Sequence, residues 1–408
     1  IGSVFIARGV GAGAGVVLSS KLYSWVGGKI VVSATLFLLA GALVSMPLNR
    51  SVLELHATFF AIGLLTSVIN CGCQIMTCRL HGSAAGPWLG ANTVAFGLSG
   101  AISPLIGFLT GVLMVEYSIL AAVTVVIGFF LVVLPRPERP DGLIEDQFIM
   151  LPLEIPQGLA QPISFYENHK IDFHLGGMMF WFMGARVSVT AFLRQYADQR
   201  GMEWSTNALL VVFFWMAITL GRLIGLRDQR TITLAPLYQH LALVSLTGAQ
   251  VVLVHFIFLS SDVGLWTVVI VLGVCNGPTL GYCFDLSTRV SPDPATSTAL
   301  TVFGLTLGAS LLPFLVSAAW DMTGWSVLFP LFLIMSHAVP FYLVMDTRRL
   351  HSAVAGSRRM FGIPDESSAH SAVLPTPTFG APRTPLSVRG SIAYLCEEET
   401  EEEAAERR

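Results

Sequence analysis

Apolar residues in this sequence gather into eleven long runs separated by short polar connections. The runs lie near 1–20, 30–48, 55–78, 87–110, 117–134, 173–193, 205–225, 234–259, 263–284, 295–319 and 325–345. A run of about 20 mostly apolar residues is long enough to cross the hydrocarbon core of a bilayer as a helix. The pattern therefore predicts an all-α membrane protein with eleven transmembrane helices, five before a long connecting segment and six after it.

Composition supports a membrane protein and excludes several classes. Hydrophobic residues make up 53% of the 408 residues and charged residues 12%, about half the quarter that is usual for soluble domains. The last 63 residues hold 18 of the 49 charges and residues 135–172 hold 10, which leaves 21 for the other 307 residues. So few charges cannot solvate a soluble surface. A soluble enzyme, a nucleic-acid-binding module and a disulfide scaffold are therefore excluded.

The spacing of the runs predicts four segments. Residues 1–134 are expected to form an N-terminal helical bundle, 135–171 a central loop, 172–346 a six-helix bundle and 347–408 a disordered tail. The tail contains prolines and an acidic run at 397–403, and such a composition cannot bury enough apolar surface to fold.

Basic residues predict the orientation, because cytoplasmic connections of membrane proteins are enriched in Lys and Arg. Twelve such residues lie at one set of helix ends and three at the other. The central loop and the tail are then cytoplasmic, and the plasma membrane is the expected location. Five helices followed by six, beginning outside, are what a twelve-helix chain without its first helix would have. The larger set is Lys21, Lys29, Arg79, Arg136, Arg139, Lys170, Arg222, Arg227, Arg230, Arg289, Arg348 and Arg349, and the smaller is Arg50, Arg194 and Arg200.

An internal repeat relates the two halves. Residues 91–104 read ANTVAFGLSGAISP and residues 298–313 read TALTVFGLTLGASLLP, so that Phe96-Gly97-Leu98 recurs 207 positions later. Pro104 corresponds to Pro313 after small insertions. The period is half the chain, which indicates a duplicated six-helix unit. Gly97 and Gly304 are expected to pack helices closely and the two prolines to bend them, with direct solute contact as the alternative.

At these residues the sequence resembles the major facilitator superfamily, and within it the sodium-dependent glucose transporter-like and fucose permease-like branch. The resemblance implies a two-bundle fold of which eleven of twelve helices are present. It also implies alternating access, a hexose-like sugar as solute, and Na⁺ or H⁺ as coupling ion, with facilitated diffusion left open. The segments that carry it are Ala85–Trp88, Phe214-Trp215, Gly221–Leu223, Gly273–Pro278 and Phe303 to Asp321.

The inner-loop signature of that superfamily is only partly kept. The segment that matches it in the first half, Ser19 to Lys29, lacks the acidic residue. The second-half copy keeps Arg222 and Asp228. A gate latched by charge pairs is therefore predicted in the second half.

Two arginines lie deep in predicted helices, where an ionised side chain is costly and by default suggests function. Arg186 lies roughly 20 Å along its helix from Asp172. It is a candidate ligand for solute hydroxyls or a carboxylate, with snorkelling or pairing across helices as the alternative. Arg8 lies near the middle of the first run. It is a candidate gating or structural residue that would bind helix-end carbonyls.

Neutral polar and aromatic residues complete the candidate site. Asn70 and Gln74 lie one turn apart, Asn276 occupies the position equivalent to Asn70, and Asn92 opens the repeat. These side chains would hold a polar solute, and the alternative is hydrogen bonding between helices. Trp181 and Trp215, with Phe180, Phe213 and Phe214, would stack on a sugar or simply pack. His174, His255 and His337 are candidates for proton relay or for structural roles.

Other chemistries lack support. The sequence contains no P-loop, HExxH or GxSxG motif, so neither ATP-driven transport nor an enzyme is predicted. Cys71 and Cys73 point in different directions on a helix, so no metal is expected. We expect a monomer that contacts lipid and a small solute, without nucleic acid or a cofactor other than a coupling ion. Two alternatives remain: an organic-anion carrier that uses Arg186 and Arg8, and a receptor or scaffold without transport.

Overall fold

The computed structural model describes residues 2–81, 86–134, 166, 169–229, 234–258, 262–290, 294–324 and 328–360. The packing considered below lies within residues 1–353, which form one compact unit. The helices of the first half are α1 (Ser3–Trp25), α2 (Gly28–Ser45), η1 (Met46–Leu48), α3 (Val52–His81), α4 (Gly86–Thr110) and α5 (Leu113–Val133). Those of the second half are α7 (Lys170–Gln199), α8 (Trp204–Gln229), α9 (Leu234–Phe258), α10 (Asp262–Asn276), α11 (Thr279–Val290), α12 (Pro294–Thr323) and α13 (Leu328–Met360).

Eleven helical segments in the described part are long and apolar enough to cross a membrane, as the sequence predicts. Two details differ from the prediction. The run expected at 263–284 is two helices, α10 and α11, because Gly277 and Pro278 interrupt it and proline has no backbone N–H to continue the ladder. The tail is expected from residue 347, but α13 continues to Met360. Residues 347–360 contain no proline and are rich in arginine near the helix end, which suits a continuing helix.

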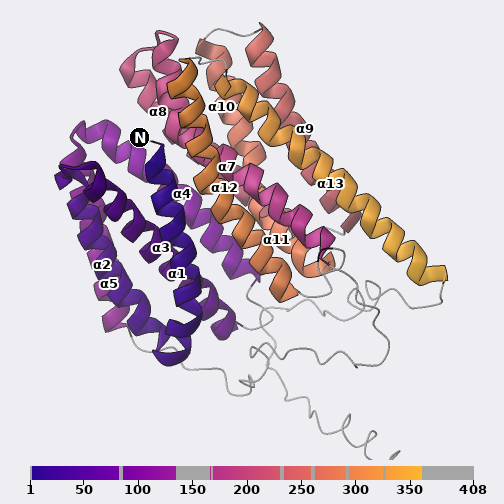
Figure 1. Ribbon diagram of the computed structural model, residues 1–408, viewed down its shortest axis with the longest axis horizontal. Helices are drawn as coiled ribbons and strands as arrows, with labels where there is room; N and C mark the ends of the chain where they lie inside the picture. Colours follow the sequence, from indigo (N-terminus) through magenta and orange to yellow (C-terminus); the bar gives the residue numbers. More distant parts are fainter. Residues whose placement is uncertain are drawn as a thin grey trace, which may run out of the picture. The chain divides into compact units, whose positions relative to one another are not determined.

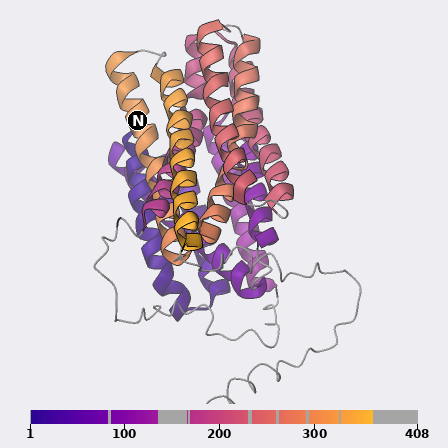
Figure 2. The same cartoon turned by 90° about the vertical axis from the view of Figure 1, so that its right-hand side faces the viewer.

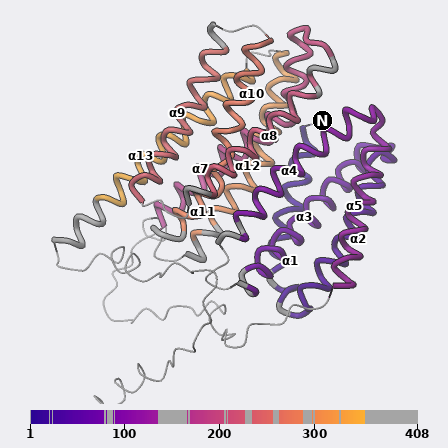
Figure 3. The backbone as a smooth tube through the Cα atoms, turned by 180° about the vertical axis from the view of Figure 1, so that it is seen from behind, coloured from indigo at the N-terminus to yellow at the C-terminus, as the bar shows by residue number. Residues whose placement is uncertain are grey.

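The two halves share a pattern of helix pairing, as expected for a duplicated unit. In the first half α1 packs on α3, and α2 packs on both α3 and α5. In the second half α8 packs on α10, and α9 packs on α10. Figure 1 shows the indigo and purple helices of the first half beside the magenta and orange helices of the second. Figure 2 shows that the helix axes are roughly aligned with one another. Figure 3 shows α2 and α5 side by side at the edge of the first half.

Glycines allow the closest helix pairs to approach. A Cβ atom added to Gly304 or Gly308 of α12 would collide with the backbone of α7 at Gly176 or Phe180. A Cβ on Gly63 of α3 would likewise meet the backbone of α1. Since lipid is as apolar as the side chains, helix association in a membrane depends on such close packing more than on hydrophobic burial.

The pair formed by α7 and α12 has no counterpart in the described part of the first half. Aligned on the prolines without insertions, rather than on the Phe-Gly-Leu match, Gly304 and Gly308 of α12 correspond to Ala95 and Ser99 of α4. The two glycines are buried under α7, whereas Ala95 and Ser99 are exposed, and Trp88 on the same side of α4 is 56% exposed. The side of α12 that α7 covers is therefore uncovered on α4.

Candidate functional site: buried arginines at a broken helix

Helices α10 and α11 are separated by a break at Gly277 and Pro278. Pro278 brings no N–H to the ladder, and the amide of Gly277 donates to the carbonyls of Gly273 and Val274 at 3.0 and 3.2 Å. Helix α8 packs directly on this break. A Cβ on Gly221 would meet the Val274 carbonyl, and one on Gly225 would meet the Pro278 ring. Broken helices of this kind bring unpaired backbone groups into the interior of a membrane protein, where they often form binding sites.

Arg186 of α7 points its side chain at this break. The side chain is 1% exposed, and Nη2 donates to the carbonyl oxygen of Asn276 at 2.6 Å. A longer contact of 3.5 Å joins Nη2 to the hydroxyl of Thr279, which itself donates to the Asn276 carbonyl at 2.8 Å. The Nε group of Arg186 is buried without a hydrogen-bond partner. The carbonyl end of α10 is thus the principal partner of this arginine.

Arg222 of α8 lies beside the same break and reaches the first half. It is 3% exposed, and its Nη1 donates to the backbone carbonyl of Thr93 on α4. The guanidinium lies over the ring of Phe96, with Cζ 5.3 Å from the ring centre. Its Nε and Nη2 are buried without hydrogen-bond partners. The partner observed is a backbone carbonyl, whereas the sequence predicts a charge pair. The side chain of Asp228 lies outside the described residues.

Asn276 and His337 form a buried hydrogen bond between α10 and α13. The Nδ2 of Asn276 donates to the Leu272 carbonyl and to Nε2 of His337, both at 3.0 Å. Nδ1 of His337 lies 2.8 Å from the Leu333 carbonyl, an arrangement that assigns the proton to Nδ1. Both side chains are nearly fully buried. The contacts of Asn276 are therefore hydrogen bonds within and between helices, the alternative to solute binding.

We expect Asn276→Leu to lower the melting temperature of the purified protein, because His337 would lose its donor inside the bundle. An unsatisfied buried polar group costs about 1–3 kcal/mol. The measurement is thermal unfolding in detergent. Asn92→Leu is the control, since Asn92 is exposed and has no hydrogen bond within the described residues. Equal melting temperatures for the two variants would contradict the structural importance of this bond.

The side chains of the candidate residues in the first half are more exposed than those in the second half. Asn70 and Arg8 are exposed, and Gln74 is half-buried. Within the described residues, no hydrogen bond joins Asn70 to Asn276. The structure therefore brings Arg186 together with the backbone of Asn276, and it does not join the two related asparagines.

The candidate aromatic residues take different positions. Trp215 is buried where α8 meets α4, edge-on to Phe96 with ring centres 5.9 Å apart. Trp181 packs on Phe180 and on Phe332 of α13, with ring centres 5.5 and 6.4 Å away. Phe214 is fully buried in the second-half core, while Phe213 is exposed. Of these, Trp215 lies at the junction of the two halves.

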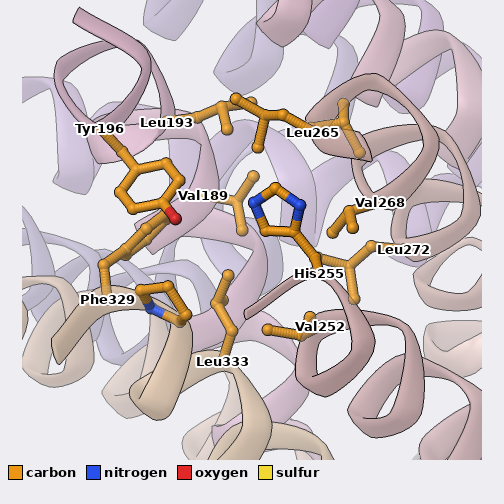
Figure 4. A pocket seen from close by; sticks show the side chains of 12 residues that line it. Val189, Leu193, Tyr196, Val252, His255, Leu265, Val268, Leu272, Phe329 and Leu333 are labelled. Carbon is orange, nitrogen blue, oxygen red and sulfur yellow. The ribbon is translucent and has the colours of Figure 1, made fainter. Parts of the chain in front are cut away.

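The remaining histidines have local partners. His174 lies 3.7 Å from the carboxylate of Asp346 and 3.3 Å from the hydroxyl of Thr347. Nε2 of His255 lies 3.1 Å from a guanidinium nitrogen of Arg200. His255 also borders a cavity of about 20 Å³ between α7, α9, α10 and α13, which Figure 4 shows. That volume holds about one water molecule, too little for a sugar or another metabolite. The other labelled lining residues are Val189, Leu193, Tyr196, Val252, Leu265, Val268, Leu272, Phe329 and Leu333.

The two halves meet along two seams at opposite faces of the helical unit. We call the face at which α1 begins the first face. At the first-face seam a Cβ on Gly2 would meet the side chain of Ser317, and one on Gly9 would meet that of Ser310. Phe5 adds a ring contact with Phe192 of α7 at 6.3 Å.

The second-face seam joins α4 to α8. A Cβ on Gly90 would meet the side chain of Leu226, one on Gly97 that of Thr219, and one on Gly100 that of Trp215. The order of these contacts makes the two helices antiparallel. Because α4 begins where α3 ends, these contacts lie toward the face opposite the start of α1. Gly97 thus packs the two halves together, while Gly304 packs α12 on α7 within the second half, and Pro104 and Pro313 lie inside their helices.

Sequence reasoning missed two features of the site. Thr93 contributes its backbone carbonyl. Every residue has such a carbonyl, so the residue type at position 93 does not indicate this role. Glu116, at the start of α5, is half-buried and accepts a hydrogen bond from Ser103 at 3.3 Å. It directly precedes the run expected near 117–134, so the hydropathy pattern leaves it outside the predicted helix.

Comparison with known proteins identifies the fold. No protein-family model and no curated protein matches the sequence. Among solved structures, the chain is similar to the major facilitator superfamily transporter FucP in the outward conformation, with a TM-score of 0.59 and 16% sequence identity over 85% of this chain and 89% of that one. It is also similar to a single-substitution variant of the E. coli fucose:proton symporter FucP, with a TM-score of 0.53 and the same identity and coverage. The chain therefore has the fold of a major facilitator superfamily transporter.

Proposed function

We propose that this protein is a secondary or facilitative transporter that moves a small polar solute across a membrane by alternating access. The observation that carries the proposal is the pair of seams at opposite faces. One seam closes the first face through α1 and α12, and the other closes the second face through α4 and α8. If the seams open in turn, a solute held between the halves meets each side of the membrane separately.

A hexose-like sugar is the first candidate solute. Its support is the likeness to FucP, a fucose:proton symporter. Polar groups such as Asn70 and Gln74 of α3 are available for sugar hydroxyls. The proposed coupling ion is H⁺ or Na⁺, and Glu116 is a half-buried carboxyl that would take part. Facilitated diffusion without an ion is the alternative.

The proposed setting is a multi-pass monomer in the plasma membrane, with residues 135–171 and the tail in the cytoplasm. The excess of Lys and Arg at the second-face ends of the helices supports this orientation. Transport here requires no enzyme chemistry. A receptor or scaffold that does not transport is the competing assignment.

Counterflow in proteoliposomes tests the proposal. The purified full-length protein is reconstituted into vesicles loaded with unlabelled L-fucose, and the entry of labelled L-fucose is followed with and without a pH gradient. We expect saturable entry above that of protein-free vesicles. The same assay is run with glucose, glucuronate and inorganic phosphate. Absence of counterflow with all four solutes would favour the receptor or scaffold.

A further inference from the structure

Two arginine side chains, Arg186 and Arg222, are buried in the second half. Among the described residues, no carboxylate forms a salt bridge with Arg186 or Arg222. Arginine keeps its proton in proteins. The two arginines lie on α7 and α8, two helices that pack against each other. An uncompensated charge is rare in a membrane interior, and two near one another call for a counter-charge.

The helix end at the break compensates only part of this charge. Arg186 binds the carbonyl end of α10, and a helix C-terminus carries roughly half a negative charge. Arg222 gains the Thr93 carbonyl and the face of Phe96, both without net charge. About half a negative charge therefore faces two positive charges. About one and a half positive charges therefore remain uncompensated.

Both arginines have unused donors, and the helices that carry them both contact the break. Nε of Arg186 and both Nε and Nη2 of Arg222 are buried without partners. Arg186 contacts Asn276 and Thr279 on the two sides of the break, and Gly221, the neighbour of Arg222, packs against Gly277 between them. Helix α11 begins at Thr279, so its free N-terminal amides and the positive end of its dipole lie at the same place.

We propose that Arg186 and Arg222 bind an oxyanion group, a carboxylate or a phosphate, of the transported solute at the α10–α11 break. The inference rests on the proposed transport function and specifies its substrate class. Guanidinium groups suit this role because their planar forks match the oxygens of carboxylate and phosphate. The same chemistry is provided by a sugar acid, another organic acid or a sugar phosphate.

The second-face seam would control access to this site. Arg222 is held to α4 by the Thr93 carbonyl and by Phe96, so separation of α4 from α8 releases its guanidinium. In the present arrangement, the unpartnered nitrogens of both arginines are shielded from solvent. Anion binding is therefore coupled to opening of the seam.

Thermal unfolding of the purified full-length protein tests the proposal. Melting temperatures are measured in detergent with D-glucuronate, with D-glucose, which lacks the carboxylate, and with inorganic phosphate, all against KCl at equal ionic strength. We expect glucuronate or phosphate to raise the melting temperature in a saturable manner, and glucose and KCl to have little effect. Equal effects of KCl and the oxyanions would indicate simple screening and would overturn the proposal.

Four variants assign the effect to residues. Arg186→Gln and Arg222→Gln should each weaken the oxyanion affinity by roughly 10- to 100-fold, the loss expected for hydrogen bonds to a charged group. Arg194→Gln, on the exposed side of α7, should keep the wild-type affinity. Should a glutamine variant fail to fold, Arg186→Lys keeps the charge and loses the fork, so its affinity should still fall. Wild-type affinity in the Arg186 and Arg222 variants would refute the site.

The outcomes separate this inference from the proposed function. Counterflow of neutral sugars together with no oxyanion stabilisation would retain the transporter and reject the anion site. Oxyanion stabilisation that depends on both arginines, with no counterflow of any solute, would retain the anion site and reject transport.

Discussion

Gly304→Val is expected to leave almost no folded protein. Gly304 of α12 lies against the backbone of α7 at Gly176, so a larger side chain has no flexible neighbour to displace. The valine side chain would therefore force α7 and α12 apart along a tightly packed interface. Overpacking of a rigid interior costs about 1–3 kcal/mol and occasionally more, and in a bilayer close contact is the main force between helices.

Size-exclusion chromatography and thermal unfolding in detergent measure this effect. Gly13→Val is the matched control, because nothing lies within 4 Å of the position where its Cβ would be. We expect a monodisperse peak and a near-native melting temperature for the control, and aggregation for Gly304→Val. If both variants eluted and melted alike, the α7–α12 contact would not be essential to the fold.

Cross-linking either seam is expected to stop transport completely and reversibly. In a background without the native cysteines, Gly90→Cys with Leu226→Cys would join α4 to α8, since the Cβ position at residue 90 lies 3.5 Å from Cγ of Leu226. Disulfides join Cβ atoms about 3.5–4.5 Å apart, so neighbouring side chains of this kind can be cross-linked after a small adjustment of the helices. Gly9→Cys with Ser310→Cys would join α1 to α12 at the other face, where the two Cβ positions lie 2.4 Å apart and the helices must separate slightly.

Each disulfide holds one face closed, so a solute that must pass both faces cannot complete the cycle. Counterflow should fall to the level of protein-free vesicles after oxidation and recover with a reductant. The four single-cysteine proteins are the controls and should transport under both conditions. Full transport through an oxidised, cross-linked protein would show that the corresponding seam does not open.

The sequence predicts the helices well because hydropathy is a property of single residues summed over a run. It does not place the break at Asn276, because the apolar run continues on both sides of Gly277 and Pro278. Proline within a helix can equally produce a bend, as Pro104 and Pro313 show by lying inside α4 and α12. At this break Gly277 packs against Gly221 of α8, a contact that residue type does not reveal.

The site was less predictable than the fold. Arg186 and Arg222 stand out in the sequence because buried charge is costly, yet their partners are the carbonyls of Asn276 and Thr93. Every residue has a carbonyl, so residue type cannot identify the acceptor. The prediction that Asn70 and Asn276 together hold the solute followed the internal repeat, but the two halves differ in burial at these positions.

The α10–α11 break has a consequence for how the chain enters the membrane during synthesis. Helix α10 has 15 residues and α11 has 12, which gives lengths of roughly 22 and 18 Å. Each is shorter than the hydrocarbon layer of about 30 Å. Their junction must be shielded from lipid by α8, which is translated earlier and can already be in the bilayer when this segment leaves the ribosome.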